Sequence, residues 1–139
     1  MDKIYHYQES FLVNLAKAYT EYNAKYIIHS LADNFRYNST WVFEELNKER
    51  YIKYIKGKLE MMRGSRSKFN FCIFDAVGRN EPHLLLTPKT PEGDFGCFIA
   101  KANDEGLIEE LSLTSARFFH HECKDKEKLK IFMEKAKKE

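Results

Sequence analysis

The chain has 139 residues, of which 43% are hydrophobic and 14% aromatic, and its formal net charge at pH 7 is +2. This length suits one compact domain, and the composition excludes a disordered or fibrous protein, because the chain can bury enough apolar surface to offset the entropy of folding. The sequence contains no run of about 18 apolar residues, the length that a membrane-spanning helix requires. The first residues, Met1 to His6, lack the apolar core of a signal peptide. We therefore expect a cytoplasmic protein without a membrane partner.

Positive charge is concentrated in the last part of the chain. Residues 124–139 hold seven Lys and four acidic residues, which leaves residues 1–123 close to neutral. This division predicts a single domain over residues 1–123, followed by a lysine-rich helix or tail. A nucleic-acid-binding domain would instead carry its positive charge as a patch or stripe beside base-reading residues, so we expect no nucleic-acid partner.

Helical periodicity marks the first half of the chain. In residues 10–26 apolar side chains recur every three or four positions, which predicts an amphipathic helix, and residues 24–31 predict a short second helix. Residues 34–41 are rich in aromatic and β-branched side chains, which favour a short strand. A second long helix is predicted over residues 46–62, ended by the Gly-Ser pair that follows.

Four strands are predicted in the second half, separated by turns rich in Gly, Pro, Asn and Asp. They cover residues 68–77, 82–87, 95–102 and 107–119. Helices first and antiparallel strands afterwards predict an α+β domain, in which the N-terminal helices pack on one face of a curved antiparallel sheet.

An aromatic wall is predicted where the helical pattern gives way to the first strand. Tyr37, Ser39 and Trp41 are two residues apart, so an extended chain points all three to one side. Tyr37 and Trp41 each join a large apolar body to a polar tip, which suits contact with a ligand, and core packing is the alternative. Tyr54, on the second long helix, is a further ligand-binding candidate. The pattern predicts a cavity that binds a small, largely apolar molecule.

Two segments carry a resemblance to a known family. They are Leu31-Ala32-Asp33-Asn34-Phe35-Arg36-Tyr37 and Asp104-Glu105-Gly106-Leu107-Ile108-Glu109-Glu110-Leu111. The first is similar to the helix-to-strand passage, and the second to a hairpin, of the nuclear transport factor 2-like superfamily with its SnoaL-like members. Together with the order of helices and strands, the resemblance covers about residues 8–119.

The resemblance implies a cone-shaped α+β barrel, whose bent sheet wraps around the long helices and leaves a cavity at its open end. Members of this superfamily include isomerases, dehydratases, cyclases, epoxide hydrolases and pure binding or oligomerisation modules. The enzymes use acid–base groups inside the cone. The resemblance also implies a homodimer formed through the outer face of the sheet.

Acid–base chemistry in such a cone requires a carboxylate or a histidine in apolar surroundings, where desolvation moves its pKa toward neutrality. Asp75 follows an otherwise apolar strand and is the first catalytic candidate. The alternative is that Asp75 caps the strand beside a turn. His83 begins the next strand and could act as a general base, or it is a surface or hydrogen-bonded histidine without a catalytic role.

The last predicted strand leaves its orientation open. Glu110, Ser112 and Thr114 share one face, and Leu111 and Leu113 share the other. If the polar set points inward, Glu110 is an acid–base candidate and Ser112 contacts the ligand. If it points outward, the same residues form a solvated or dimer-facing surface.

The sequence predicts no metal site and no cofactor. His120, His121 and Cys123 are close in sequence, but adjacent side chains of a strand point to opposite faces and a fourth ligand is not evident. Three hypotheses remain: a protein that binds a small apolar ligand, a SnoaL-like isomerase, dehydratase or cyclase, and a protein-interaction or dimerisation module.

Overall fold

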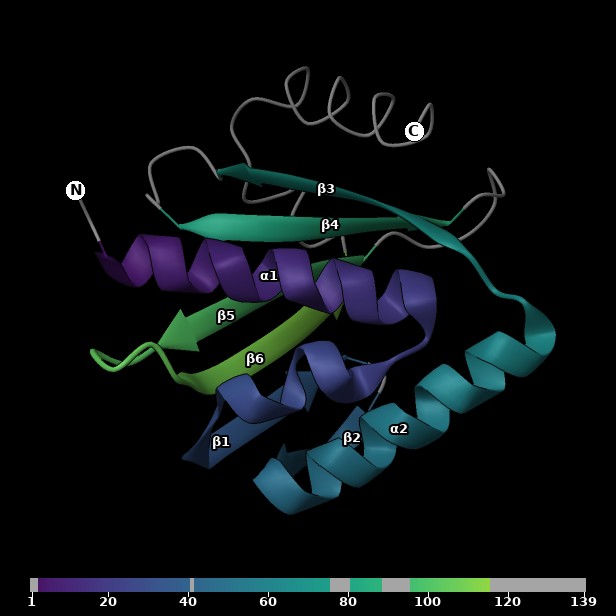
Figure 1. The fold of residues 1–139 in the computed structure, drawn as a ribbon, viewed down its shortest axis with the longest axis horizontal. Helices are drawn as coiled ribbons and strands as arrows, with labels where there is room; N and C mark the ends of the chain where they lie inside the picture. The colour runs from purple at the N-terminus through teal and green to yellow at the C-terminus, as the bar shows by residue number, and fades with distance from the viewer. Residues whose placement is uncertain (1–2, 41, 76–80, 89–95, 116–139) are drawn as a thin grey trace.

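A computed structural model of the chain describes residues 3–40, 42–75, 81–88 and 96–115 (Figure 1). The helices are α1 (Lys3–Glu21), the short 3₁₀ helices η1 (Ala24–Tyr26) and η2 (Ile28–Ser30), and α2 (Lys48–Ser65). The strands are β1 (Leu31–Ser39), β2 (Val42–Asn47), β3 (Phe69–Asp75), β4 (Pro82–Pro88), β5 (Gly96–Ala102) and β6 (Ile108–Ser115). The α+β fold class predicted from the sequence is confirmed. Trp41 and the lysine-rich segment 124–139 lie outside the described residues.

The described strands form one sheet in the order β2-β1-β6-β5-β4-β3. Neighbouring strands run antiparallel except β1 and β6, which are parallel and pair Tyr37 with Leu111. Among the described strands the predicted antiparallel sheet thus contains one parallel pair, β1 with β6. Parallel neighbours require a long connection, and the chain between β1 and β6 contains α2 and the other strands. The sheet is curled but open, so the implied barrel is not closed.

The two long helices cover one face of the sheet. Figure 1 shows α1 lying across the β3–β5 side, which it contacts, while α2 lies over β1 and β2. Side chains on this inner face alternate with outward-facing ones along each strand, as the pleat requires. The largest fully buried side chains include Phe35, Tyr37, Leu84, Phe98 and Ile108. These residues form the core between sheet and helices.

The first helix begins and ends earlier than the sequence predicts. Its buried face includes Phe11, Leu15 and Ala18, the helical spacing seen in the sequence. The helix stops at Glu21 because Tyr22 takes a left-handed backbone conformation with φ 54°. The side chain of Asn23 then caps η1 by accepting a hydrogen bond from the backbone N–H of Lys25 at 3.0 Å.

Strand β2 was not predicted, because its sequence carries two consecutive glutamates. Glu45 forms an ion pair with Arg36 of β1 at 3.2 Å, and Glu44 forms one with Arg50 of α2 at 2.7 Å. Pairing with β1 therefore stabilises a segment whose own composition is not typical of a strand. The Asn47 side chain ends β2 and caps α2 by accepting from the Arg50 N–H at 2.9 Å.

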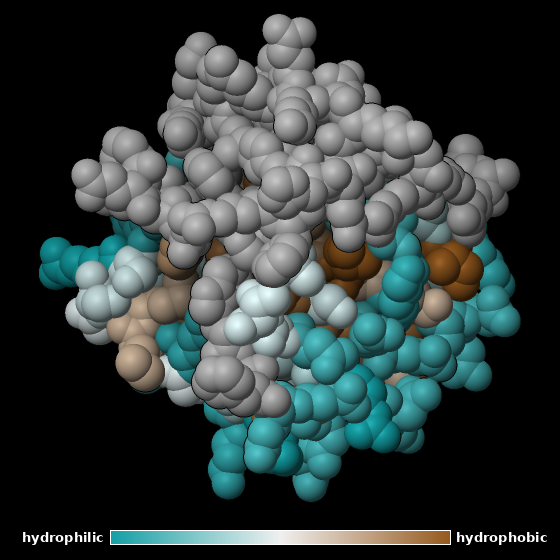
Figure 2. All heavy atoms as spheres, turned by 180° about the vertical axis from the view of Figure 1, so that it is seen from behind, coloured by the Kyte–Doolittle hydropathy of each residue, from teal (hydrophilic) through white to brown (hydrophobic). Residues whose placement is uncertain are grey.

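The outer face of the sheet is charged over β1, β5 and β6. Arg36, Lys101 and Glu110 are exposed there. Seen from behind, the described surface is largely hydrophilic, with small hydrophobic patches (Figure 2). Within the described segments, no helix has the length and apolar composition that crossing a membrane requires.

Candidate ligand-binding site

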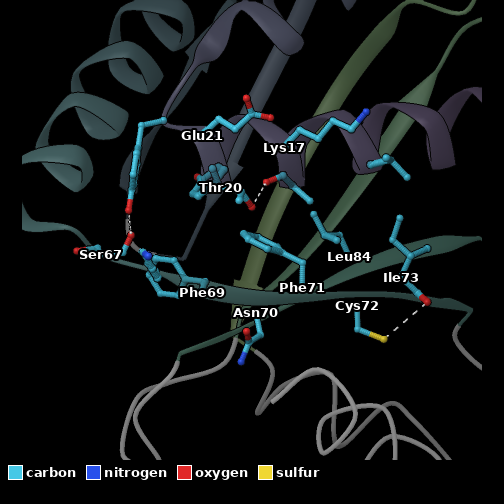
Figure 3. A pocket seen from close by; sticks show the side chains of 15 residues that line it. Lys17, Thr20, Glu21, Ser67, Phe69, Asn70, Phe71, Cys72, Ile73 and Leu84 are labelled. Atoms are coloured by element: carbon cyan, nitrogen blue, oxygen red, sulfur yellow. Dashed lines mark hydrogen bonds between the residues drawn. The ribbon is translucent and has the colours of Figure 1, made fainter. Parts of the chain in front are cut away.

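A cavity of about 600 Å³ lies between α1 and the edge strand β3, and we refer to it as the α1–β3 cavity (Figure 3). Its lining comes from the C-terminal half of α1, the start and middle of β3, and Leu84 of β4. Because β3 is the last strand of the described sheet, the cavity opens at a sheet edge. A volume of this size is typical of small-molecule sites.

Apolar side chains make the floor of the α1–β3 cavity. Figure 3 shows Phe71, Ile73 and Leu84 pointing toward α1, while Asn70 and Cys72 point away from it. This follows from the two-residue alternation of side chains along β3.

Tyr19 of α1 holds the inner end of this floor in place. Its ring meets Phe71 edge to face at 6.0 Å between centroids, and Phe98 in the same manner at 5.7 Å. Such pairs fix ring positions as well as burying area.

Polar residues line the rim of the α1–β3 cavity, among them Lys68 beside the start of β3. Lys17, Thr20 and Glu21 line it from α1, and Ser67 precedes β3. The Tyr22 hydroxyl donates to the Ser67 carbonyl oxygen at 2.7 Å, which ties the end of α1 to the start of β3. An apolar floor with a polar rim suits a largely apolar molecule that bears a polar edge.

No protein-family model matches the sequence, and no curated protein matches it. Solved structures do match. A SnoaL-like protein of unknown function from Burkholderia thailandensis is 14% identical, with a TM-score of 0.59 over 80% of this chain and 96% of that chain. A steroid delta-isomerase from Pseudomonas aeruginosa is 12% identical, with a TM-score of 0.55 over 77% of each chain. A nuclear transport factor 2-like protein of unknown function from Cytophaga hutchinsonii is 15% identical, with a TM-score of 0.52 over 80% of this chain and 92% of that chain.

The chain has the nuclear transport factor 2-like fold. The resemblance predicted from the sequence is confirmed at the level of fold.

Inside this nuclear transport factor 2-like fold, three tyrosines of β1 and α2 form a cluster in the core. The ring centroid of Tyr37 lies 4.7 Å from that of Tyr51 and 5.7 Å from that of Tyr54. Burial is the main cause that raises the pKa of Tyr37 and of Tyr51, and the nearby tyrosines raise it further. Burial likewise raises the pKa of Tyr19. These hydroxyls are neutral hydrogen-bonding groups over the physiological pH range.

The Tyr37 hydroxyl is buried, and among the described residues no group meets it with hydrogen-bond geometry. The Ser39 and Tyr54 side chains lie close to it, and their weak hydrogen-bonding interactions lower and raise its pKa respectively, without forming a well-aligned hydrogen bond. We expect Tyr37→Phe to leave the free energy of unfolding unchanged or to raise it by about 1 kcal/mol, since a buried hydroxyl without a partner is costly. Tyr22→Phe, which removes the bond to Ser67, is expected to lower it by about 1 kcal/mol. Urea unfolding followed by circular dichroism measures both; equal destabilisation by the two variants would contradict the assignment.

The nuclear transport factor 2-like fold brings together only some of the predicted ligand-binding residues. Tyr37 and Tyr54 meet in the tyrosine cluster, where Tyr37 is 1% exposed and Tyr54 half-buried. Ser112 lies on the outer face with Glu110, to which its hydroxyl donates at 3.4 Å, because Leu111 and Leu113 fill the inner face. The polar set of β6 therefore points outward, and neither Glu110 nor Ser112 lines the α1–β3 cavity.

The two other predicted catalytic residues lie at neighbouring ends of β3 and β4. Asp75 pairs with Pro82 across these strands, and its side chain lies outside the described part of the structure. His83 is fully buried, and its Nδ1 lies 2.9 Å from the Glu81 carbonyl oxygen. Register places His83 on the face opposite Leu84, which belongs to the cavity floor. Over the described residues, no three His, Cys, Asp or Glu side chains gather as metal ligands would.

Sequence reasoning missed the residues that build the cavity. Tyr19 and Phe71 come from segments more than fifty positions apart, so no local pattern joins them. One signal was present: Phe69, Phe71 and Ile73 alternate with polar or small residues, which predicts an apolar face on this strand. This alternation did not reveal that α1 leaves part of the apolar face of β3 uncovered.

Proposed function

We propose that the chain binds a small, largely apolar molecule in the α1–β3 cavity. The observation that carries the proposal is the pairing of an open volume of about 600 Å³ with a floor of Phe71, Ile73 and Leu84. Phe71 and Ile73 are half-buried, so part of the inner face of β3 remains available to a ligand. Burial of apolar ligand surface on this floor would contribute about 2.5 kcal/mol per 100 Å², from which the cost of association must be subtracted.

The rim adds orientation to this binding. The Lys17 ammonium, the Thr20 hydroxyl and the Glu21 carboxylate all line the cavity from one helix. The Thr20 hydroxyl donates to the Ala16 carbonyl oxygen at 2.8 Å and can still accept from a ligand, and Glu21 accepts from the Tyr26 hydroxyl at 2.8 Å. A ligand with one polar edge would thus place that edge toward α1 and its apolar body on β3.

A fluorescence titration with 1-aminoanthracene, a neutral apolar dye, tests the proposal. We expect saturable enhancement with the natural sequence and at least a tenfold weaker affinity for Ala16→Trp, because the half-buried Ala16 lines the cavity and an indole would fill it. Ser10→Trp is the matched control: Ser10 is an exposed residue of the same helix outside the cavity lining. Its affinity should equal that of the natural sequence.

Equal dye affinity in all three proteins, with thermal unfolding showing that each is folded, would refute the site. Two further hypotheses from the sequence stay predictions: acid–base catalysis by Asp75, His83 or Glu110, and association of two copies through the outer sheet face. The described geometry does not favour catalysis inside the cone by His83 or Glu110, since the alternation of side chains along β4 and β6 places both off the inner face.

A further inference from the structure

A second cavity, of about 660 Å³, runs along α2 on the other side of Ser67, and we call it the α2 cavity. It is lined by Lys53, Tyr54, Gly57, Lys58, Met61, Met62, Ser65 and Ser67. This lining is apolar apart from two lysines, a tyrosine hydroxyl and two serines. Of the residues described as lining it, none is acidic. The α2 cavity is therefore both apolar and positively charged.

Lys58 is the central cation of this cavity. It is half-buried, and its Nζ lies 5.7 Å from the ring centroids of both Tyr19 and Tyr54 and donates to the Tyr54 hydroxyl at 3.4 Å. Within the described residues it has no carboxylate at ion-pair distance, whereas three other basic residues of α2 do: Lys48 with Asp33, Arg50 with Glu44 and Arg63 with Glu60. The rings of Tyr19 and Tyr54 thus contact the partly desolvated Lys58 ammonium. None of the described side chains supplies an anion to pair with it.

Gly57 leaves room beside that ammonium. It lies in the middle of α2, where glycine is less favourable than almost any other residue. A Cβ built at Gly57 would meet no atom within 4 Å, so close packing does not require glycine here. The effect of the missing side chain is to widen the cavity next to Lys58.

Two methionines continue the cavity wall. Met61 is 77% exposed, and Met62 beside it is 8% exposed. Methionine side chains are flexible and polarisable, which suits contact with a linear alkyl chain of varying position.

We propose that the α2 cavity binds a long-chain carboxylate. The carboxylate accepts hydrogen bonds from the Lys58 ammonium and the Tyr54 hydroxyl, and the alkyl chain lies over Gly57 against Met61. This site is separate from the α1–β3 cavity and goes beyond the function proposed for it. The charge of Lys58 selects an anion, and the apolar wall selects an alkyl chain over a small inorganic anion.

Isothermal titration calorimetry with dodecanoate and with dodecanol tests this assignment. With the natural sequence we expect dodecanoate to bind at least tenfold more tightly than dodecanol. Lys58→Met, which keeps an unbranched side chain only one atom shorter but removes its charge, should abolish that difference. Gly57→Leu should weaken both ligands at least tenfold by filling the cavity.

The variants carry their own controls. Leucine favours a helix more than glycine does, so weaker binding by Gly57→Leu is not explained by a less stable helix. Gly64→Leu is the matched control, since Gly64 also lies in α2 with no atom within 4 Å of a built Cβ but does not line the cavity. It should bind as the natural sequence does, and so should Ala16→Trp if the two cavities are independent.

Three results would overturn the proposal. The first is equal affinity of the natural sequence for dodecanoate and dodecanol, and the second is unchanged dodecanoate affinity in Gly57→Leu. The third is co-sedimentation with phosphatidylglycerol vesicles without any heat of dodecanoate binding, which would identify a membrane surface as the ligand of Lys58. Retention in the supernatant together with dodecanoate binding supports the free carboxylate.

Discussion

Phe98→Ala is expected to lower the free energy of unfolding by about 3–5 kcal/mol, among the largest effects of any single substitution in this protein. Phe98 is completely buried in the central part of the sheet, paired with Leu84 on one side and Leu113 on the other. Its ring also meets Tyr19 edge to face at 5.7 Å. Alanine would remove these apolar contacts and leave a cavity between β5, its neighbours β4 and β6, and α1. These elements cannot move together to close it.

Urea unfolding followed by circular dichroism measures the effect. Met61→Ala is the control, because Met61 is 77% exposed and its truncation should change the free energy of unfolding by no more than about 0.5 kcal/mol. Comparable values for the two variants would mean that the core does not lie between α1 and the centre of the sheet.

Raising the pH above about 10 is expected to destabilise the fold steeply. Tyr19, Tyr37 and Tyr51 have pKa values above the ordinary tyrosine value of 10.0, chiefly because of burial. Above that ordinary value the unfolded chain loses its tyrosine protons while the folded chain keeps them, so the folded state binds more protons and its stability falls as pH rises. Each such tyrosine contributes a slope of about 1.4 kcal/mol per pH unit, and the three together about 4 kcal/mol per pH unit. Below the ordinary pKa their contribution is constant.

Lysines also titrate in this range, so the tyrosine effect is best isolated by a variant. Tyr51→Phe should reduce the slope of unfolding free energy against pH by about 1 kcal/mol per pH unit between roughly pH 10 and pH 11, rising toward about 1.4 kcal/mol per pH unit at higher pH. Near-ultraviolet absorbance of tyrosinate provides a second measurement, since the three buried groups should ionise only as the protein unfolds. An identical slope in Tyr51→Phe would show that Tyr51 titrates normally in the folded state.

The helices and most strands could be predicted because their burial follows local periodicity. Phe11, Leu15 and Ala18 mark α1, and the alternation of Phe69, Phe71 and Ile73 marks β3. Strand β2 could not be predicted, because its glutamates are satisfied by arginines of other elements. The parallel pairing of β1 with β6 joins segments about seventy residues apart, and no local pattern determines such a pairing.

The candidate sites were harder to predict than the fold. The two-residue alternation of side chains along a strand placed Tyr37 on one side of β1, and this side is the inner one. There the ring of Tyr37 packs against Tyr51 and does not line an open space. Which face of β6 is buried became clear only from the structure, where Leu111 and Leu113 fill the core. The cavities depend on where α1 and α2 leave parts of their surroundings uncovered, a property of packing between distant elements.

Amide chemical-shift mapping with 1-aminoanthracene tests most directly whether the α1–β3 cavity binds a ligand. If it does, saturable shifts should concentrate at residues 13–22, in and just after α1, and at residues 67–73, just before and at the start of β3, the segments that line the cavity. They should be absent from the same segments in Ala16→Trp and present in Ser10→Trp. Shifts confined to the outer face around Glu110 and Lys101, or no saturable shifts at all, would contradict a ligand site between α1 and β3.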